Sequence, residues 1–190
     1  MRRQYASRSL DLADLHADPF LQFDLWMREA IETELLEPNA MALATVSATG
    51  APSVRTVLLK GFDARGLVFY TNYNSSKARQ IGENSNVAVL FHWDQLGRQV
   101  RIEGQAVRSP AAESDAYFST RDWGSQLGAW GSDQSQPLAS RNALLAQVAG
   151  RAVKLGVNVA KNLQSIIGSE RPTIERPPHW GGFRIWANSV

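Results

Sequence analysis

The stretch Arg55–Lys77, RTVLLKGFDARGLVFYTNYNSSK, decides how the whole chain is interpreted. Its first apolar run carries two cations, Arg55 and Lys60, and a short turn at Asp63–Gly66 leads to a second run, LVFYTN. Two runs rich in β-branched and apolar residues on either side of a turn predict a β-hairpin. The cluster Asn74–Lys77 that follows has the residues expected where a helix begins.

This helix start is a candidate anion site. Free backbone N–H groups, hydroxyls and the Lys77 ammonium would converge there, and phosphate is the anion that fits best. The common alternative is that the cations lie on a solvated strand face and that Ser and Asn only cap the helix. Arg55 and Lys60 are five residues apart, so in an unbulged strand their side chains point to opposite faces. The two cations therefore need either a bulge or two different ligands.

The composition excludes several classes of protein. A chain of 190 residues suits one domain, and its 20 basic against 18 acidic residues come with no basic run or RNA-binding motif, so we expect no nucleic-acid partner. Cysteine is absent and the three histidines lie far apart, so we expect no metal site. No apolar run approaches the roughly 20 residues of a spanning helix, and no signal-peptide core follows the N-terminus. We therefore expect a soluble cytoplasmic protein without a membrane partner.

The rest of the sequence favours strands. An amphipathic helix is predicted from Asp18–Pro19 and ends before Pro38. Five or six short antiparallel strands without regular βα alternation then point to a small barrel, mainly β with flanking helices. The GxGxxG fingerprint is missing, which disfavours a Rossmann domain. Further strands are predicted at Met41–Ser47, Val87–Trp93, Gln99–Val107 and His179–Trp186, and further helices at Ser76–Asn84, from Ser109–Pro110 and at Leu138–Val159.

A second candidate site lies in Ser119–Ser135, STRDWGSQLGAWGSDQS. By composition the segment reads as an irregular loop. However, Tyr117, Arg121 and Ser125 recur at i, i+4 and i+8, so they share one face if the preceding helix persists. Two hydroxyls would then flank a guanidinium. This arrangement is a second candidate cradle for an oxyanion.

Eight motifs in one order connect the chain with a known family: RTVLLK, FYTN, SSKARQI, RQVRIEG, AYFSTR, SQLGAW, DQS and PPHWGGFR. Together they closely resemble the pyridoxamine 5'-phosphate oxidase family of FMN enzymes. The resemblance covers almost the whole chain. It implies that residues 1–190 form one domain. It implies an FMN-binding split β-barrel (α+β) that forms a homodimer with FMN at the subunit interface.

The resemblance also implies a cofactor site. Arg55 and Lys77 resemble the family's FMN-phosphate cations, and Gln99 would hydrogen-bond the flavin. Gln134 and Ser135 would close the site from the partner subunit. The residues implied at the cofactor are Arg55, Thr56, Val57, Leu58, Lys60, Tyr70, Thr71, Ser76, Lys77, Gln99, Gln134 and Ser135.

A second group of residues resembles the family's substrate site. It would hold the phosphate of the vitamin B6 substrate, so the opposed side chains of Arg55 and Lys60 can serve two different phosphates. The N-terminal residues 1–17 resemble an arm that folds over bound substrate. The residues implied at the substrate are Arg2, Arg3, Tyr5, Lys60, Tyr117, Arg121 and Ser125.

The implied reaction is the oxidation of pyridoxamine or pyridoxine 5'-phosphate to pyridoxal 5'-phosphate. Hydride would pass to FMN, and O2 would reoxidise the flavin and release hydrogen peroxide, while Lys60 and Arg121 orient the substrate. One alternative is a related FMN oxidase of another substrate, such as a phenazine precursor, which has less need of the substrate-phosphate residues. The other is a non-catalytic split-barrel protein that carries or senses a flavin or a B6 phosphate.

The sequence departs from the family pattern in two places. Where many members have Ser-Arg-Lys, this chain has Ser75-Ser76-Lys77, so one cation beside the FMN phosphate is missing and weaker FMN binding is expected. Members also continue past the WGGFR strand into a segment with a flavin-contacting Trp and Arg and an Arg-x-His pair. None of these follows in the sequence up to Val190. Slower turnover is expected if Val190 is the natural terminus, and a longer and more active chain is expected if it is not.

Overall fold

The computed structural model describes residues 10–155 and 174–190. These residues form two compact units, which lie within Met1–Phe69, Gln80–Val107 and Arg184–Val190 for the first and within Tyr70–Arg79 and Arg108–Phe183 for the second. The predicted substrate residues Arg2, Arg3 and Tyr5 lie outside the described residues. The prediction of a single domain stays a prediction.

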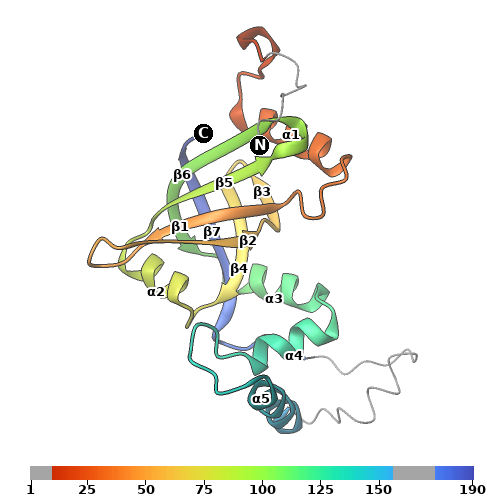
Figure 1. The fold of residues 1–190 in the computed structure, drawn as a ribbon, viewed down its shortest axis with the longest axis vertical. Helices are drawn as coiled ribbons and strands as arrows, with labels where there is room; N and C mark the ends of the chain where they lie inside the picture. The colour runs from red at the N-terminus through yellow and green to blue at the C-terminus, as the bar shows by residue number, and fades with distance from the viewer. Residues whose placement is uncertain (1–9, 156–173) are drawn as a thin grey trace. The chain divides into compact units, whose positions relative to one another are not determined.

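A seven-stranded sheet curls into a half-barrel, with strand order β2-β1-β5-β6-β7-β4-β3 (Figure 1). Antiparallel pairing joins β1 to β2 and β5, β3 to β4, and β5 to β6. This confirms the predicted antiparallel barrel, with seven strands where five or six are predicted. The strands are β1 (Ala40–Val46), β2 (Pro52–Leu58), β3 (Gly61–Asp63), β4 (Gly66–Asn72), β5 (Asn86–Trp93), β6 (Arg98–Arg108) and β7 (Trp180–Ser189).

The part of the opening stretch before the turn forms two strands, β2 and β3, where the sequence predicts one. β2 pairs with β1, with Arg55 opposite Leu43, whereas β3 pairs with β4 across the predicted turn. β2 and β3 lie at opposite edges of the sheet. The predicted hairpin is therefore correct only for β3 and β4, which pair across the turn. The chain leaves β2 after Leu58, and the Lys60 N–H donates to the Val68 carbonyl at 2.8 Å. Arg55 and Lys60 are therefore not on one strand, and their opposed faces need no bulge.

The core of the first unit is aromatic. Helix α1 (Pro19–Ile31) begins where predicted, because the Asp18 carboxylate accepts an N–H of the first turn. Its Phe23 is 2% exposed and meets Phe62 edge-on, with ring centroids 4.9 Å apart, and Phe91 at 5.0 Å. Burying a large apolar side chain contributes roughly 1.5–3 kcal/mol, so this contact fixes α1 on the sheet.

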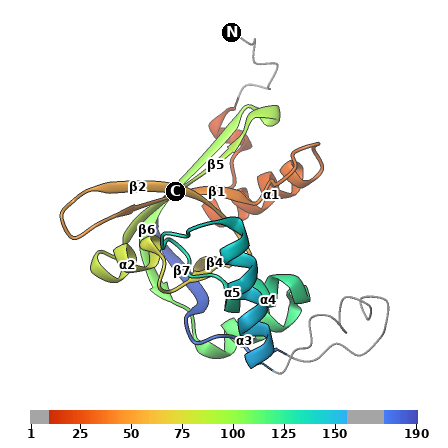
Figure 2. The same ribbon diagram turned by 60° about the horizontal axis from the view of Figure 1, so that its bottom comes forward.

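The second unit is built mainly from helices (Figure 2). Tyr70 stacks on Tyr117, with ring centroids 4.0 Å apart, and on Trp180 at 5.3 Å. These rings belong to an apolar cluster with the buried Phe118 and Leu127. The helices are α3 (Ala111–Thr120), α4 (Trp123–Gly131) and α5 (Arg141–Lys154); α2 (Ser76–Glu83) and the short 3-10 helices η1 (Leu12–Asp14) and η2 (Asp94–Leu96) complete the described elements.

The chain breaks between α3 and α4. Arg121 adopts an extended backbone, with φ −71° and ψ 149°, and Asp122 caps α4 by accepting the Ser125 N–H at 2.9 Å. The predicted continuous helix with Tyr117, Arg121 and Ser125 on one face is therefore wrong. An irregular loop over 119–135 is also wrong, because α4 fills its centre. The Asp122 side chain explains the break, since short polar side chains favour caps over helix interiors.

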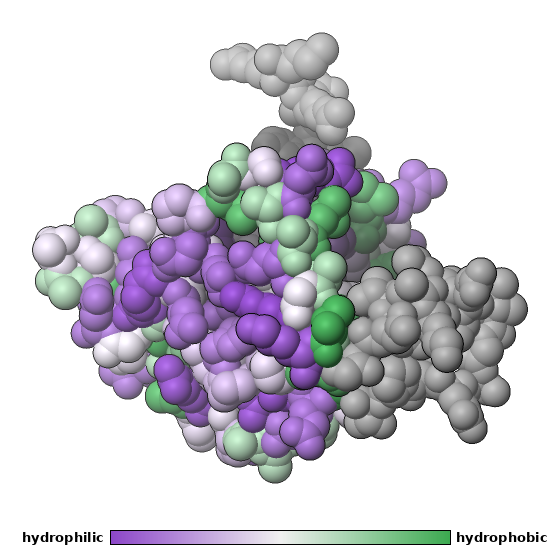
Figure 3. Space-filling view, turned by 90° about the horizontal axis from the view of Figure 1, so that it is seen from below, coloured by the Kyte–Doolittle hydropathy of each residue, from purple (hydrophilic) through white to green (hydrophobic). Residues whose placement is uncertain are grey.

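The outer surface is predominantly polar where Figure 3 shows it. On that face hydrophobic side chains gather only in small groups among hydrophilic ones. Within the described residues, no helix combines the length and the apolar character needed to cross a membrane.

Candidate functional site

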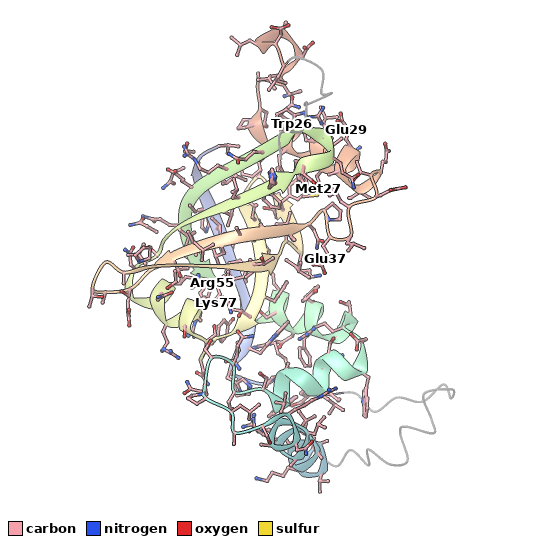
Figure 4. The ribbon with its side chains drawn as sticks, viewed as in Figure 1. Trp26, Met27, Glu29, Glu37, Arg55 and Lys77 are labelled. Carbon is pink, nitrogen blue, oxygen red and sulfur yellow. The ribbon has the colours of Figure 1, made fainter. Side chains whose placement is uncertain are left out.

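Arg55 belongs to a polar cluster of the first unit (Figure 4). Its Nη1 donates to the Leu43 carbonyl at 3.1 Å and to the Thr45 hydroxyl at 2.6 Å, and its Nη2 donates to Gln80 Oε1 at 3.2 Å. Thr45 is fully buried and itself donates to Gln80 Oε1 at 2.5 Å. Burial lowers the pKa of Arg55, but a guanidinium stays charged at neutral pH. The cluster therefore holds a cation in one fixed position.

Lys77 belongs to a second cluster, within the second unit. Its Nζ donates to the Thr71 hydroxyl at 3.1 Å and to Gln134 Oε1 at 2.8 Å. At the same start of α2, the Ser76 N–H donates to the Ser135 hydroxyl at 3.2 Å. Five residues implied at the cofactor thus lie together. These contacts are made within one chain, and the closing of a partner subunit's site by Gln134 and Ser135 stays a prediction.

Ser135 has a strained backbone. Its φ is 68°, and it is the only non-glycine residue with positive φ in the described part of the chain. A left-handed backbone costs a non-glycine residue roughly 1–2 kcal/mol. Such strain is most frequent at binding and active sites. The Ser135 hydroxyl lies at the start of α2, where it accepts the Ser76 N–H.

A cavity of about 330 Å³ adjoins this cluster through Gln134. Its size lies at the small end of known ligand sites, which hold roughly 300–1,000 Å³. Arg79 is the only cation among its six lining residues, and the carboxylate of the one acid, Asp133, is paired with Arg151 at 2.8 Å. The lining residues are Asn72, Asn74, Arg79, Asp133, Gln134 and Gln136.

The donors at this cavity and cluster fit a phosphate ester such as the phosphate of FMN. The Lys77 ammonium and the Thr71 and Ser135 hydroxyls surround the start of α2, a helix of 8 residues. The N–H groups at a helix start carry partial positive charge and bind anions. The set therefore supplies charged, hydroxyl and backbone donors together.

Two predicted substrate residues meet at an aromatic platform of the second unit. The Arg121 guanidinium lies 4.5 Å from the Trp180 ring centroid, and the Tyr117 ring lies parallel to that indole, with an interplanar angle of 8°. The Arg121 Nη1 is buried and has no hydrogen-bond partner among the described residues. Burial lowers the pKa of Arg121. Because a buried donor without an acceptor is costly, this position favours an anionic ligand.

The other predicted residues are more dispersed. Ser125 lies in the first turn of α4, and its backbone is already bonded to Asp122. Lys60 is exposed in the first unit. Thr56 and Gln99 are exposed on β2 and β6, and Val57 and Leu58 are half-buried on β2. Their roles stay predictions.

Comparison with known proteins identifies the family of the chain. The family model described as pyridoxamine 5'-phosphate oxidase matches residues 27–153. Proteins named pyridoxine/pyridoxamine 5'-phosphate oxidase from Burkholderia mallei (strain SAVP1) and Burkholderia thailandensis are 45% identical over 190 residues, which is 100% of this chain and 82% of theirs.

Solved structures show the same fold. PhzG from Burkholderia lata 383, in complex with tetrahydrophenazine-1-carboxylic acid, has a TM-score of 0.80 at 29% identity, covering 96% of this chain and 84% of its own. A pyridoxamine 5'-phosphate oxidase-related, FMN-binding protein from Nostoc punctiforme has a TM-score of 0.63 at 18% identity, covering 90% and 82%, and supports the fold alone. The curled antiparallel half-barrel with flanking helices is thus a split barrel, and the chain belongs to the pyridoxamine 5'-phosphate oxidase family.

Proposed function

We propose that the protein is an FMN-dependent oxidase that converts pyridoxamine or pyridoxine 5'-phosphate to pyridoxal 5'-phosphate, with O2 as acceptor and hydrogen peroxide as product. The observation that carries the proposal is the buried Arg121 Nη1, which has no partner within the described residues. The Arg121 guanidinium lies over Trp180, and the Tyr117 ring is parallel to the same indole. A guanidinium in this setting suits a phosphate carried by a flat aromatic ring. The 45% identity to relatives named for this activity supports it.

The FMN phosphate would be held by Lys77, the Ser135 hydroxyl and the start of α2, together with Arg55. Helix α2 carries both Lys77 and, three residues later, Gln80, the acceptor of the Arg55 guanidinium. When bound, FMN supplies the acceptor for the hydride from the substrate C4' carbon and passes the electrons to O2. Thr56, Val57, Leu58, Tyr70 and Gln99 are the residues proposed along the flavin.

The chain's own contribution is binding and orientation. Arg121, with the hydroxyls of Tyr117 and Ser125 and the Lys60 ammonium, would hold the substrate phosphate. This phosphate is remote from the reacting carbon, so its binding energy can be used to set the position of that carbon. Misplacement by about 1 Å can cost on the order of a hundredfold in rate. The active form would be a homodimer with FMN at the interface; Val54, 67% exposed on the edge strand β2, is apolar surface that such an interface could cover.

A second candidate is oxidation of a phenazine precursor. The observation that favours it is the TM-score of 0.80 to PhzG, whose structure contains tetrahydrophenazine-1-carboxylic acid. Identity to that protein is 29%, against 45% for the relatives named as B6-phosphate oxidases. The joint presence of Lys60, Tyr117, Arg121 and Ser125 favours a substrate with a phosphate group.

One experiment separates these functions. The flavin absorbance of the purified protein is recorded, and peroxide release is measured with pyridoxamine 5'-phosphate, pyridoxine 5'-phosphate or a reduced phenazine carboxylic acid. We expect a flavin spectrum and peroxide with the B6 phosphates. Peroxide with the phenazine substrate alone would identify the related oxidase, and bound flavin without peroxide from any substrate would identify a carrier or sensor.

A further inference from the structure

Helix α2 begins without the arginine expected from the family pattern. The sequence reads Ser75-Ser76-Lys77 in place of Ser-Arg-Lys. In the proposed FMN site, the neutral hydroxyl of Ser76 therefore stands where a guanidinium would face the phosphate.

Arg79 places a guanidinium next to this position. It follows Ser76 by three residues, which puts both side chains on the same side of the helix. Its Nη2 donates to the Ser76 hydroxyl at 3.2 Å, and its Nη1 donates to the Asn74 carbonyl at 2.5 Å. The side chain thus folds back over the beginning of α2 while Arg79 remains exposed.

This guanidinium can still bind a ligand. Arginine has five N–H donors, and the two hydrogen bonds to Ser76 and Asn74 use only two of them. Arg79 is also the only cation among the six residues that line the 330 Å³ cavity. The one carboxylate among these lining residues, that of Asp133, is already paired with Arg151 at 2.8 Å and accepts from Gln147 at 3.0 Å.

The charges around the start of α2 favour a bound anion. The start of a helix carries partial positive charge, which repels a cation and attracts a negative group. Arg79 and Lys77 both lie close to this end of α2. A phosphate dianion at this position would offset the repulsion between the helix start and the two cations, because it interacts favourably with all three.

We propose that Arg79 supplies the second cation of the FMN phosphate site in α2 and replaces the arginine that is missing at position 76. The inference rests on the proposed FMN site. The positive charge then comes from a residue one turn further along the helix. The Ser76 hydroxyl accepts a hydrogen bond from the Arg79 guanidinium and holds it in place. Arg79 does not occupy the family position, so the family motif gives no indication of its role.

The test compares two flavins with and without a phosphate. FMN and riboflavin are titrated into the full chain, and quenching of flavin fluorescence gives the dissociation constants. Arg79→Ala should weaken FMN binding by about 10- to 100-fold, since one charge-assisted contact is lost, and leave riboflavin binding unchanged. The double variant Ser76→Arg/Arg79→Ala should recover most of the FMN affinity. Arg28→Ala, at an exposed pair on α1, is the matched control for loss of a surface arginine.

The outcomes distinguish this inference from the proposed function. If the wild-type chain binds FMN and Arg79→Ala binds it equally well, the role of Arg79 is wrong while the proposed function stands. Equal weakening of FMN and riboflavin, with a lower melting temperature, would show a merely structural role. If the wild-type chain binds no FMN, the proposed function fails and the inference fails with it.

Discussion

The Arg121 guanidinium lies 4.5 Å from the centroid of the Trp180 indole. Stacking of this kind is worth about 0.5–2 kcal/mol and holds the guanidinium plane in place before any ligand arrives. Its Nη1 remains buried and unpaired within the described residues, which is a cost to the folded protein. A site that tolerates such a cost is prepared for an anion.

Removal of Arg121 should therefore affect the substrate and spare the cofactor. Loss of a hydrogen bond to a charged group costs about 1.5–3 kcal/mol, so we expect Arg121→Ala to lower kcat/KM for pyridoxamine 5'-phosphate by roughly 10- to 100-fold. The kcat/KM of Arg121→Lys should lie between those of the wild type and Arg121→Ala, because lysine keeps the charge but not the planar guanidinium. Steady-state peroxide assays and flavin content measure both effects. Loss of flavin from Arg121→Ala would show that Arg121 serves the cofactor and that its assignment to the substrate is wrong.

Lys77 and Arg55 should control the cofactor. Each would contribute a charge-assisted hydrogen bond to the FMN phosphate, so Lys77→Ala and Arg55→Ala should purify with much less flavin than the wild type. Riboflavin lacks the phosphate, so its affinity should change little in Lys77→Ala. The flavin-to-protein absorbance ratio and a fluorescence titration give these values. Unchanged FMN content in both variants would contradict the assignment.

Local patterns in the sequence predicted much of the fold and of the Lys77 cluster. The Asp18–Pro19 helix start and the alternation in β6, where Val100 and Ile102 are buried and Arg101 is exposed, follow from short-range rules. The family motifs then pointed to Thr71, Lys77, Gln134 and Ser135, which the structure brings together.

The errors have a common physical origin in tertiary context. The strand RTVLLKGFD reads as one apolar run, yet the half-barrel divides it between two edges of the sheet, because β2 pairs with β1 and β3 with β4. Tyr117, Arg121 and Ser125 have a helical spacing, but Asp122 caps α4 and the helix is interrupted between α3 and α4. The spacing from Ser76 puts Arg79 on the same side of α2, but only the structure shows that its side chain folds back over the helix start.

Two glycines offer a matched test of backbone constraint. Gly66 has φ +113°, and a Cβ there would lie 1.9 Å from the Ile185 carbonyl oxygen, whereas a Cβ at Gly82 in α2 meets nothing within 4 Å. Gly66→Ala should lower the free energy of unfolding by on the order of 3 kcal/mol or more, through clash and left-handed strain. Gly82→Ala should raise it by about 0.5–1 kcal/mol. Urea unfolding measures both, and equal effects at the two sites would contradict this reading of the backbone.

The carboxylate of Asp63 should make stability depend on pH. It accepts side-chain hydrogen bonds from Arg65 at 2.7 Å and from the buried Arg184 at 2.9 Å. Its pKa is lowered, first by the side-chain hydrogen bond from Arg65 and further by the positive charge of Arg184. A lowered pKa means that the folded state prefers the ionised form. The stabilisation is therefore complete above the unfolded-state pKa of about 3.9. It is lost as the pH falls through the lower pKa of the folded state.

Asp63→Asn tests this by removing the charge with little change in size. At neutral pH we expect the variant to be less stable by about 1 kcal/mol, a modest value because the carboxylate is 43% exposed and partly screened. The difference in melting temperature from the wild type should persist down to about pH 5 and shrink below about pH 4, where the wild-type carboxylate takes up its proton. Asp24→Asn, at the exposed i,i+4 pair with Arg28, serves as control and should change stability little at any pH. A difference between Asp63→Asn and the wild type that stays constant from neutral to acid pH would show that the shape of the side chain, and not its charge, stabilises this corner of the sheet.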